Sequence, residues 1–529
     1  MKPTLVASLI ALSLGCLTAP VLSAPSLPST NVAWQPAAVD ADIERAFARA
    51  KAENKPVLLY WGATWCPPCN QLKATLFNRQ DFAALSRSFV AVHVDGDRPG
   101  AQKLGTRFKV SGYPTVVLFT PQGQEITRLP GEADAPQVMA VLQSGLSGGR
   151  PVKAVLDDAL AGKTLPAGDW KMLAFYSWGT DEQQLVPKAD VPATLVRLAL
   201  ASTAANTDTE TTTRLWLQAL AASDDGKGVK ADDSLRARVL KVLADPVQSR
   251  LHMDVLSNGA DDIVRTLEPE DESGLNPGRA PMLAAFDSAL KRLQADTTLS
   301  RNDRLGALYA RVLLARLGNP KDAVQVKLPE PLLQEVRDHV ARADREITDG
   351  YERQAVITYA AALLGRAGLW ADSESLLKSN LAKSHSPYYL MSQLGGNARR
   401  LGKKDEALRW YGQAWDKSEG PATRVQWGTG YVAALLELAP ADAPRIEKTV
   451  TQLLTEAGRD SGIFQGRSVR QLQRMGGKLA SWGAEGKPAA ALARLQATLG
   501  GVCAKVEAAD GQRASCAALF IKPAPKPAA

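Results

Sequence analysis

The sequence is poor in the residues that most often bind metal ions. Five cysteines and four histidines occur among its 529 residues. The histidines are scattered along the chain, at His93, His252, His339 and His385, whereas a structural zinc site brings four ligands together. We therefore predict no metal site and interpret the isolated histidines as surface or packing residues.

Long apolar runs are also scarce, and the first lies near the N-terminus. Residues 5–17 are apolar, but a transmembrane helix needs about 20 residues. A lysine precedes this run and small residues follow it, which is typical of a secretory signal peptide. We expect residues 1–23 to be removed after Ser23, and residues 24–31 to form a linker.

These features of the signal peptide favour export to a bacterial periplasm. Lipid anchoring at Cys16 is the alternative, but a lipoprotein signal has an aliphatic residue three positions earlier, where this chain has Ser13. No later apolar run could span a membrane. The net charge is +8, yet no cluster of Lys and Arg with interleaved aromatic residues indicates nucleic-acid binding.

Four cysteines remain once Cys16 leaves with the signal peptide, and in an oxidising compartment they suggest two pairs. Cys66 and Cys69 are separated by two residues, a spacing found in half zinc sites, structural disulfides and redox pairs. A zinc site would need more ligands than lie near these two cysteines in the sequence. A disulfide in so small a ring restricts the unfolded chain little, so the spacing favours redox chemistry.

The sequence around these cysteines alternates between strands and helices. Helical periodicity covers residues 41–52, and a short apolar run at 57–61 is typical of a strand buried on both faces. Further elements follow in order: a helix from Cys66, strands at 89–94 and 116–119, a hairpin strand at 124–129, and a helix at 134–146. Residues 32–147 are thus predicted to form one small α/β domain.

Cys66 is expected to occupy the N-cap of its helix. Pro67 and Pro68 then fall in the first turn, where proline is tolerated. The helix dipole favours a thiolate there, so we predict that Cys66 is the nucleophile and Cys69 the resolving cysteine. Because the two prolines lack N–H groups, we expect the pKa of Cys66 to be lowered only moderately.

Several motifs together resemble the thioredoxin-fold thiol-disulfide oxidoreductases, in particular exported members similar to the C-terminal domain of DsbD. They are Lys55-Pro-Val-Leu-Leu, Trp65-Cys-Pro-Pro-Cys69, Phe89-Val-Ala-Val-His-Val-Asp95 and Val110-Ser-Gly-Tyr-Pro-Thr115. The resemblance covers about one fifth of the chain. It implies disulfide exchange with protein thiols and a redox partner protein, without a dissociable cofactor.

The resemblance also implies roles for residues around the cysteines. Trp65, Pro67, Pro68, Tyr113 and Pro114 would position the substrate, and the Tyr113–Pro114 bond would be cis. The backbone of Tyr113 would pair with the substrate as an added strand.

One departure from the family leaves the direction of electron flow open. Many members carry a buried Asp six residues before the first cysteine and a Lys on the neighbouring strand, which move protons to and from the second cysteine. This chain has Tyr60 and Ala91 there. Tyr60 is either packing or a substitute in the relay, and reductase, isomerase and oxidase remain alternatives.

Beyond residue 147 the sequence predicts an all-α region. Residues 148–350 contain amphipathic helical segments, with loops expected at 224–232, 258–281 and 318–329. Within residues 351–500, Gly368 and Gly402, and likewise Pro387 and Pro421, lie 34 positions apart. This period resembles the tetratricopeptide repeat, in which helix pairs stack into a solenoid. A generic helical array is the alternative.

The role of this helical region is not defined by its sequence. Its aromatic residues are expected in the core between helices: Trp370, Tyr388, Tyr389, Trp410, Tyr411 and Trp415. If the helical region instead binds a client protein, the whole chain would act as a scaffold with an accessory thioredoxin domain. This scaffold role is the alternative to disulfide exchange.

The last segment, residues 501–529, is predicted to hold a disulfide loop and a disordered tail. Cys503 and Cys516 flank a polar stretch, and we expect them to form a structural disulfide. A second redox station that exchanges with Cys66 and Cys69 is the alternative.

Overall fold

The structure is a computed structural model that describes residues 31–223, 228–269, 276, 278–320, 322–460, 462–484 and 488–521. The predicted signal peptide with Cys16, most of the linker and the tail at 522–529 lie outside these residues. Within the described part of the chain, no helix is both long enough and apolar enough to cross a membrane.

A five-stranded sheet organises the N-terminal part, in the order β1-β3-β2-β4-β5. Strands β1, β3 and β2 run parallel to one another. Strand β4 pairs antiparallel with β2, and β5 pairs antiparallel with β4. The strands are β1 (Gln35–Ala37), β2 (Val57–Gly62), β3 (Val90–Asp95), β4 (Thr115–Phe119) and β5 (Glu125–Leu129). Every residue of β2 is buried, as its continuous apolar run predicts. The predicted thioredoxin fold is confirmed.

Helices cover both faces of this sheet. Helices α1 (Asp40–Glu53) and α4 (Ala101–Arg107) pack on one face. The other face is covered by α2 (Pro67–Leu72), α3 (Gln80–Leu85) and α5 (Ala135–Leu146), with a short π-helical turn after α2. Strand β1 and helices α3 and α4 were not recognised in the sequence, because each is short.

The remainder of the described chain is helical, as predicted. Its helices are α6 (Val152–Leu160), α7 (Ala167–Ala174), α8 (Val191–Ala204), α9 (Thr209–Ala222), α10 (Asp233–Ala244), α11 (Pro246–Leu251), α12 (Met253–Asn258), α13 (Ala260–Leu267), α14 (Arg279–Ala295), α15 (Arg301–Ala315), α16 (Glu330–Glu346), α17 (Gly350–Arg366), α18 (Trp370–Asn380), α19 (Pro387–Arg400), α20 (Lys404–Lys417), α21 (Pro421–Leu438), α22 (Ala443–Ala457), α23 (Gly466–Ala484), α24 (Ala489–Cys503) and α25 (Gln512–Ala517). The loop expected at 258–281 was partly wrong, because it contains α13, whose apolar side chains are fully buried.

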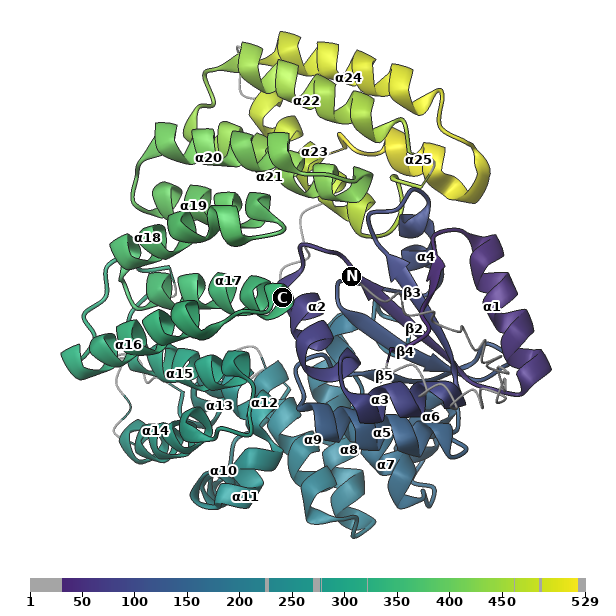
Figure 1. The fold of residues 1–529 in the computed structure, drawn as a ribbon, viewed down its shortest axis with the longest axis vertical. Helices are drawn as coiled ribbons and strands as arrows, with labels where there is room; N and C mark the ends of the chain where they lie inside the picture. The colour runs from purple at the N-terminus through teal and green to yellow at the C-terminus, as the bar shows by residue number, and fades with distance from the viewer. Residues whose placement is uncertain are drawn as a thin grey trace, which may run out of the picture.

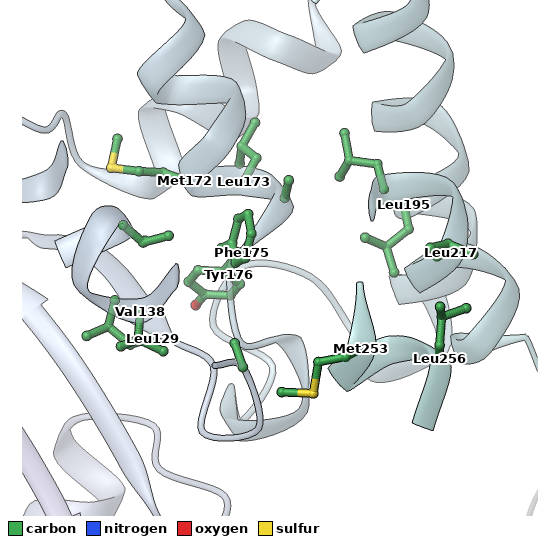
Figure 2. Packing of buried hydrophobic residues seen from close by; sticks show 14 of the residues in the cluster. Leu129, Val138, Met172, Leu173, Phe175, Tyr176, Leu195, Leu217, Met253 and Leu256 are labelled. Atoms are coloured by element: carbon green, nitrogen blue, oxygen red, sulfur yellow. The ribbon is translucent and has the colours of Figure 1, made fainter. Parts of the chain in front are cut away.

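The helical region curves around the α/β domain (Figure 1). Its first helices share one hydrophobic core with the sheet, as Figure 2 shows for Leu129 and Val138 beside Phe175 and Tyr176. Farther along, α17 packs on α2 and α23 packs on α4. The α/β domain is therefore enclosed from two sides by helices distant in the sequence.

The helix pairs keep the 34-residue spacing noted in the sequence. Gly368 and Gly402 end the first helix of successive pairs with φ of +80° and +74°, a conformation that favours glycine. Pro387 and Pro421 each begin the next helix. The relationship to tetratricopeptide repeats stays a prediction.

Cys503 and Cys516 form a disulfide that links α24 to α25. Both cysteines are buried in the core of the C-terminal helices, far along the chain from Cys66. The described structure joins them to each other and leaves Cys66 and Cys69 as free thiols.

Candidate redox site

The two free cysteines lie in the turn that connects β2 to α2, which we call the redox turn (residues 64–69). Cys66 occupies the N-cap of α2, and Pro67 and Pro68 fill the first helical positions. The backbone N–H of Cys69 donates to Cys66 Sγ at 3.4 Å. It is the first N–H of the helix that the prolines leave available.

A buried amide fixes the shape of the redox turn. The side-chain NH₂ of Asn70 donates to the carbonyl oxygens of Thr64 and Cys66, each at 2.8 Å. These two bonds hold the backbone on both sides of Cys66. The position of the thiol is thus set by the strand, the helix and this side chain together.

The loop before β4 completes the site. The Tyr113–Pro114 peptide bond is cis. The Tyr113 hydroxyl accepts a hydrogen bond from Gln102 at 2.8 Å. Gly131, after β5, faces Pro114 so closely that a Cβ would lie 3.3 Å from the proline ring. The cis-proline loop is therefore packed between the sheet end and the segment after β5.

Side chains of the helical region close over the redox turn, and we call them the helical cover (Gln354, Tyr389, Thr423, Trp427 and Arg467). The Trp65 indole N–H donates to Thr423 Oγ1 at 2.6 Å. The Trp65 carbonyl accepts from Gln354 at 3.2 Å.

Aromatic rings and a cation complete the helical cover. The ring of Trp65 stacks on Tyr389, with centroids 6.1 Å apart, and meets Trp427 edge-on at 5.7 Å. The guanidinium of Arg467 lies 5.3 Å from the Trp65 ring and 5.6 Å from the Tyr113 ring. Tyr389 therefore does not pack only between helices, as its sequence position suggested, but contacts the redox turn.

Burial by this cover changes the chemistry of Cys66. Its exposed fraction is 3%, close to the 0% of Cys69. Burial raises the pKa of Cys66 well above its ordinary value, and the neighbouring Cys69 side chain adds to this. The Cys69 N–H and Arg467 act in the opposite direction. The expected lowering of the Cys66 pKa was wrong for this closed arrangement, because desolvation outweighs the helix terminus.

Asp97 connects the α/β domain to the helical cover. Its carboxylate accepts from the Thr423 N–H at 2.6 Å, from the Thr423 hydroxyl, and from the Trp65 indole at 3.2 Å. Burial raises the pKa of Asp97 to about 6, nearby Asp95 adds to the increase, and the bonds from Thr423 and Trp65 oppose it. Nothing in the sequence around Asp97 indicated this role.

Tyr60 stands where many family members have an acidic residue. Its ring stacks on His93, with centroids 4.9 Å apart. Its hydroxyl is buried and has no hydrogen-bond partner among the described residues. Burial and the charges of Cys69 and Cys66 raise the pKa of Tyr60. The ring packs in the core, and its hydroxyl lies within the electrostatic reach of both cysteines.

The fold and the redox turn together define a thioredoxin-type dithiol centre. The family profile described as a thioredoxin-like domain matches residues 43–146. A thioredoxin-like protein of Synechocystis, slr0233, is 36% identical over 89 residues, which cover 17% of this chain and 80% of that protein. The chain belongs to the thioredoxin-like family through this domain.

Longer proteins also match over about a fifth of the chain. The thiol:disulfide interchange protein DsbD 2 of Pseudomonas aeruginosa is 31% identical over 120 residues, 22% of this chain and 20% of that protein. The chain thus matches about a fifth of the length of this relative. A thioredoxin from Thermus thermophilus is 27% identical; the match covers 21% of this chain and 83% of that one, with a TM-score of 0.19. The predicted resemblance to thioredoxins and DsbD is confirmed for the N-terminal domain.

Proposed function

We propose that the protein is a periplasmic thiol-disulfide oxidoreductase that exchanges disulfides with protein thiols. The observation that carries this proposal is the pair of free thiols at the N-terminus of α2, packed beside a cis-proline loop. The similarity to a thiol:disulfide interchange protein supports it.

The exchange proceeds in two steps. The Cys66 thiolate attacks one sulfur of a substrate disulfide, forms a mixed disulfide with it and releases the other sulfur as a thiolate. The Cys69 thiolate then attacks Cys66 Sγ, closes the Cys66–Cys69 disulfide and releases the second substrate thiolate. Two electrons pass to the substrate, and the reverse sequence oxidises a substrate dithiol.

Residues around the two cysteines have different roles in these two reaction steps. The Cys69 N–H and Arg467 stabilise the negative charge on Cys66. Trp65, Pro67, Pro68, Tyr113 and Pro114 shape the surface that receives the substrate. Because the helical cover buries Cys66, a protein substrate reaches the sulfur only when Trp65 separates from Thr423 and Tyr389.

Exchange assays on the full chain test this proposal. The reduced protein should reduce insulin and oxidised glutathione, and Cys66→Ser should abolish both activities. Cys69→Ser should retain the first step and accumulate a mixed disulfide on Cys66, detectable by mass spectrometry. Absence of exchange by the unaltered protein under conditions in which Cys66 can be alkylated would contradict the proposal.

A further inference from the structure

The start of α23 lies against the surface through which a substrate would reach Cys66. A substrate sulfur must come within bonding distance of Cys66 Sγ, and Trp65 and the cis-proline loop (residues 110–114) form the surface beside this thiol. Residues 462–470 contact both of them, and we call these residues the α23 clamp. The contacts of the α23 clamp therefore determine how a protein disulfide can approach the redox site.

An arginine of the α23 clamp binds the backbone of the cis-proline loop. Arg470 Nη2 donates to the carbonyl oxygen of Ser111 at 2.9 Å and to that of Val110 at 3.3 Å. The same guanidinium lies 3.7 Å from the Glu182 carboxylate. While Arg470 holds this position, its side chain covers acceptors of the loop that a substrate could otherwise contact.

A buried amide joins the α23 clamp to the side chain of Tyr113. The Ser468 N–H donates to Gln102 Oε1 at 3.2 Å, and Gln102 Nε2 donates to the Tyr113 hydroxyl at 2.8 Å. Gln102 is 3% exposed. The clamp, α4 and the cis-proline loop are thus connected by one continuous set of hydrogen bonds.

Glycines allow the backbone of the α23 clamp to approach the α/β domain closely. The Gly466 N–H donates to Thr106 Oγ1 at 2.8 Å, and its φ of +55° favours glycine. A Cβ on Gly466 would lie 2.5 Å from the Gln102 carbonyl oxygen, and a Cβ on Gly462 would lie 2.9 Å from the Gly100 Cα. Side chains at these two positions would therefore separate the clamp from the domain.

The contacts of the α23 clamp can break without unfolding of the sheet. Each hydrogen bond between protein groups contributes only modestly to stability, because water replaces the lost partner. Segments at the edge of a fold commonly open while the core stays folded. In the closed arrangement Cys66 is 3% exposed, so opening of the clamp would be needed before a protein disulfide could react.

We propose that the α23 clamp is an autoinhibitory element, which keeps the redox site closed to protein disulfides until it separates from the cis-proline loop. This proposal rests on the proposed function and concerns the regulation of the same site. The rate of exchange with a protein substrate is then set by the fraction of molecules in which the clamp is open.

Arg470→Gln tests the proposal in the full-length protein. It removes the charged donor to the cis-proline loop, and we expect iodoacetamide to alkylate Cys66 about tenfold faster at constant pH. Loss of a nearby positive charge would by itself disfavour the Cys66 thiolate and slow alkylation, so acceleration reports opening. Arg474→Gln, one turn farther along α23 at an exposed position, is the matched control and should react like the unaltered protein.

Gly462→Ala tests the same contact without a change of charge. The added methyl group meets the backbone of Gly100, so this variant should also accelerate alkylation of Cys66. Gly501→Ala on α24 places a methyl group where no atom lies within 4 Å and should leave the rate unchanged. Both opened variants should reduce insulin faster than their controls by the same factor as alkylation.

Hydrogen exchange of the unaltered protein needs no variant to fold. The peptide 462–470 should exchange its amide hydrogens faster than β2, whose residues are all buried. Mild urea, below the unfolding transition, should accelerate this exchange and the alkylation of Cys66 in parallel. Exchange of residues 462–470 only together with β2 would show that the clamp does not open by itself, which overturns the proposal.

The remaining outcomes separate autoinhibition from the proposed function. Equal alkylation rates for Arg470→Gln and Arg474→Gln, or faster alkylation without faster insulin reduction by a protein that does reduce insulin, would overturn the autoinhibitory role and leave disulfide exchange intact. If neither the unaltered protein nor the opened variants reduce insulin or oxidised glutathione, the proposed function fails. Alkylation of Cys66 then still decides whether the clamp closes the site.

Discussion

The guanidinium of Arg467 lies 5.3 Å from the ring of Trp65, the residue that precedes Cys66. Arg467 belongs to α23, at the far end of the helical region. It has neither an ion pair nor a hydrogen bond among the described residues, and burial lowers its pKa. The helical region thus contributes a positive charge to a site built by the N-terminal domain.

Arg467→Gln should raise the pKa of Cys66 further, by about one unit, because it removes a charge that favours the thiolate. Arg467→Lys should retain most of the effect. The dependence of iodoacetamide alkylation on pH measures this pKa in the reduced protein. Arg494→Gln, which removes an exposed arginine paired with Glu447, is the control. A Cys66 pKa unchanged by Arg467→Gln would contradict the electrostatic role.

Thr423→Val should open the helical cover. It removes the hydroxyl that accepts from Trp65 and donates to Asp97, while it preserves the side-chain volume. Loss of buried hydrogen bonds of this kind costs about 1–3 kcal/mol, so Cys66 should be alkylated about tenfold faster at constant pH. Thr498→Val on α24 serves as the matched control, and equal alkylation rates for both variants would refute the closing role of Thr423.

Stability should depend on pH through Asp97. Its pKa in the folded protein, about 6, is raised above its ordinary value of 3.8. The folded state therefore binds the proton more tightly, and the resulting stabilisation is complete below the lower pKa and disappears as pH rises through 6. Asp303 titrates in the same range, so the effect of Asp97 must be isolated by subtraction.

Urea unfolding between pH 4 and pH 7 gives the free energies of unfolding of the unaltered protein and of Asp97→Asn. Their difference at each pH isolates the contribution of Asp97. The free energy of unfolding of the unaltered protein, relative to the variant, should fall as the pH rises through about 6. A difference that stays constant or grows with pH would contradict the raised pKa.

The C-terminal disulfide should contribute to the stability of the fold but not to the disulfide-exchange activity of Cys66 and Cys69. Replacing Cys503 and Cys516 by serine opens a loop with a sequence separation of 13, which should lower the free energy of unfolding by about 3 kcal/mol. Insulin reduction by the folded variant should match that of the unaltered protein. Loss of reduction without unfolding would favour a second redox station.

The sequence predicts the elements of the redox turn because its signals are local. An apolar run specifies β2, the prolines place Cys66 at the N-cap of α2, and the Gly-Tyr-Pro-Thr motif marks the cis-proline loop. Each signal lies within a few residues of the structure that it determines.

The helical cover could not be predicted in the same way. Tyr389, Thr423 and Arg467 reach the redox turn only because the array of helices curves around the sheet, and that curvature is the sum of many helix-packing angles. Their sequence neighbourhoods resemble ordinary amphipathic helices. The raised pKa of Cys66 follows from this tertiary burial, so local reasoning gave the wrong direction.

We propose above all that Cys66 and Cys69 form a reversible two-electron redox pair. An equilibrium titration in buffers of reduced and oxidised dithiothreitol, followed by labelling of free thiols with a maleimide of high mass, measures it directly. We predict that both thiols disappear together in one two-electron transition and that Cys66→Ser abolishes it. Thiols that stay reduced across the whole range, or that are oxidised independently of each other, would show that Cys66 and Cys69 are not such a pair.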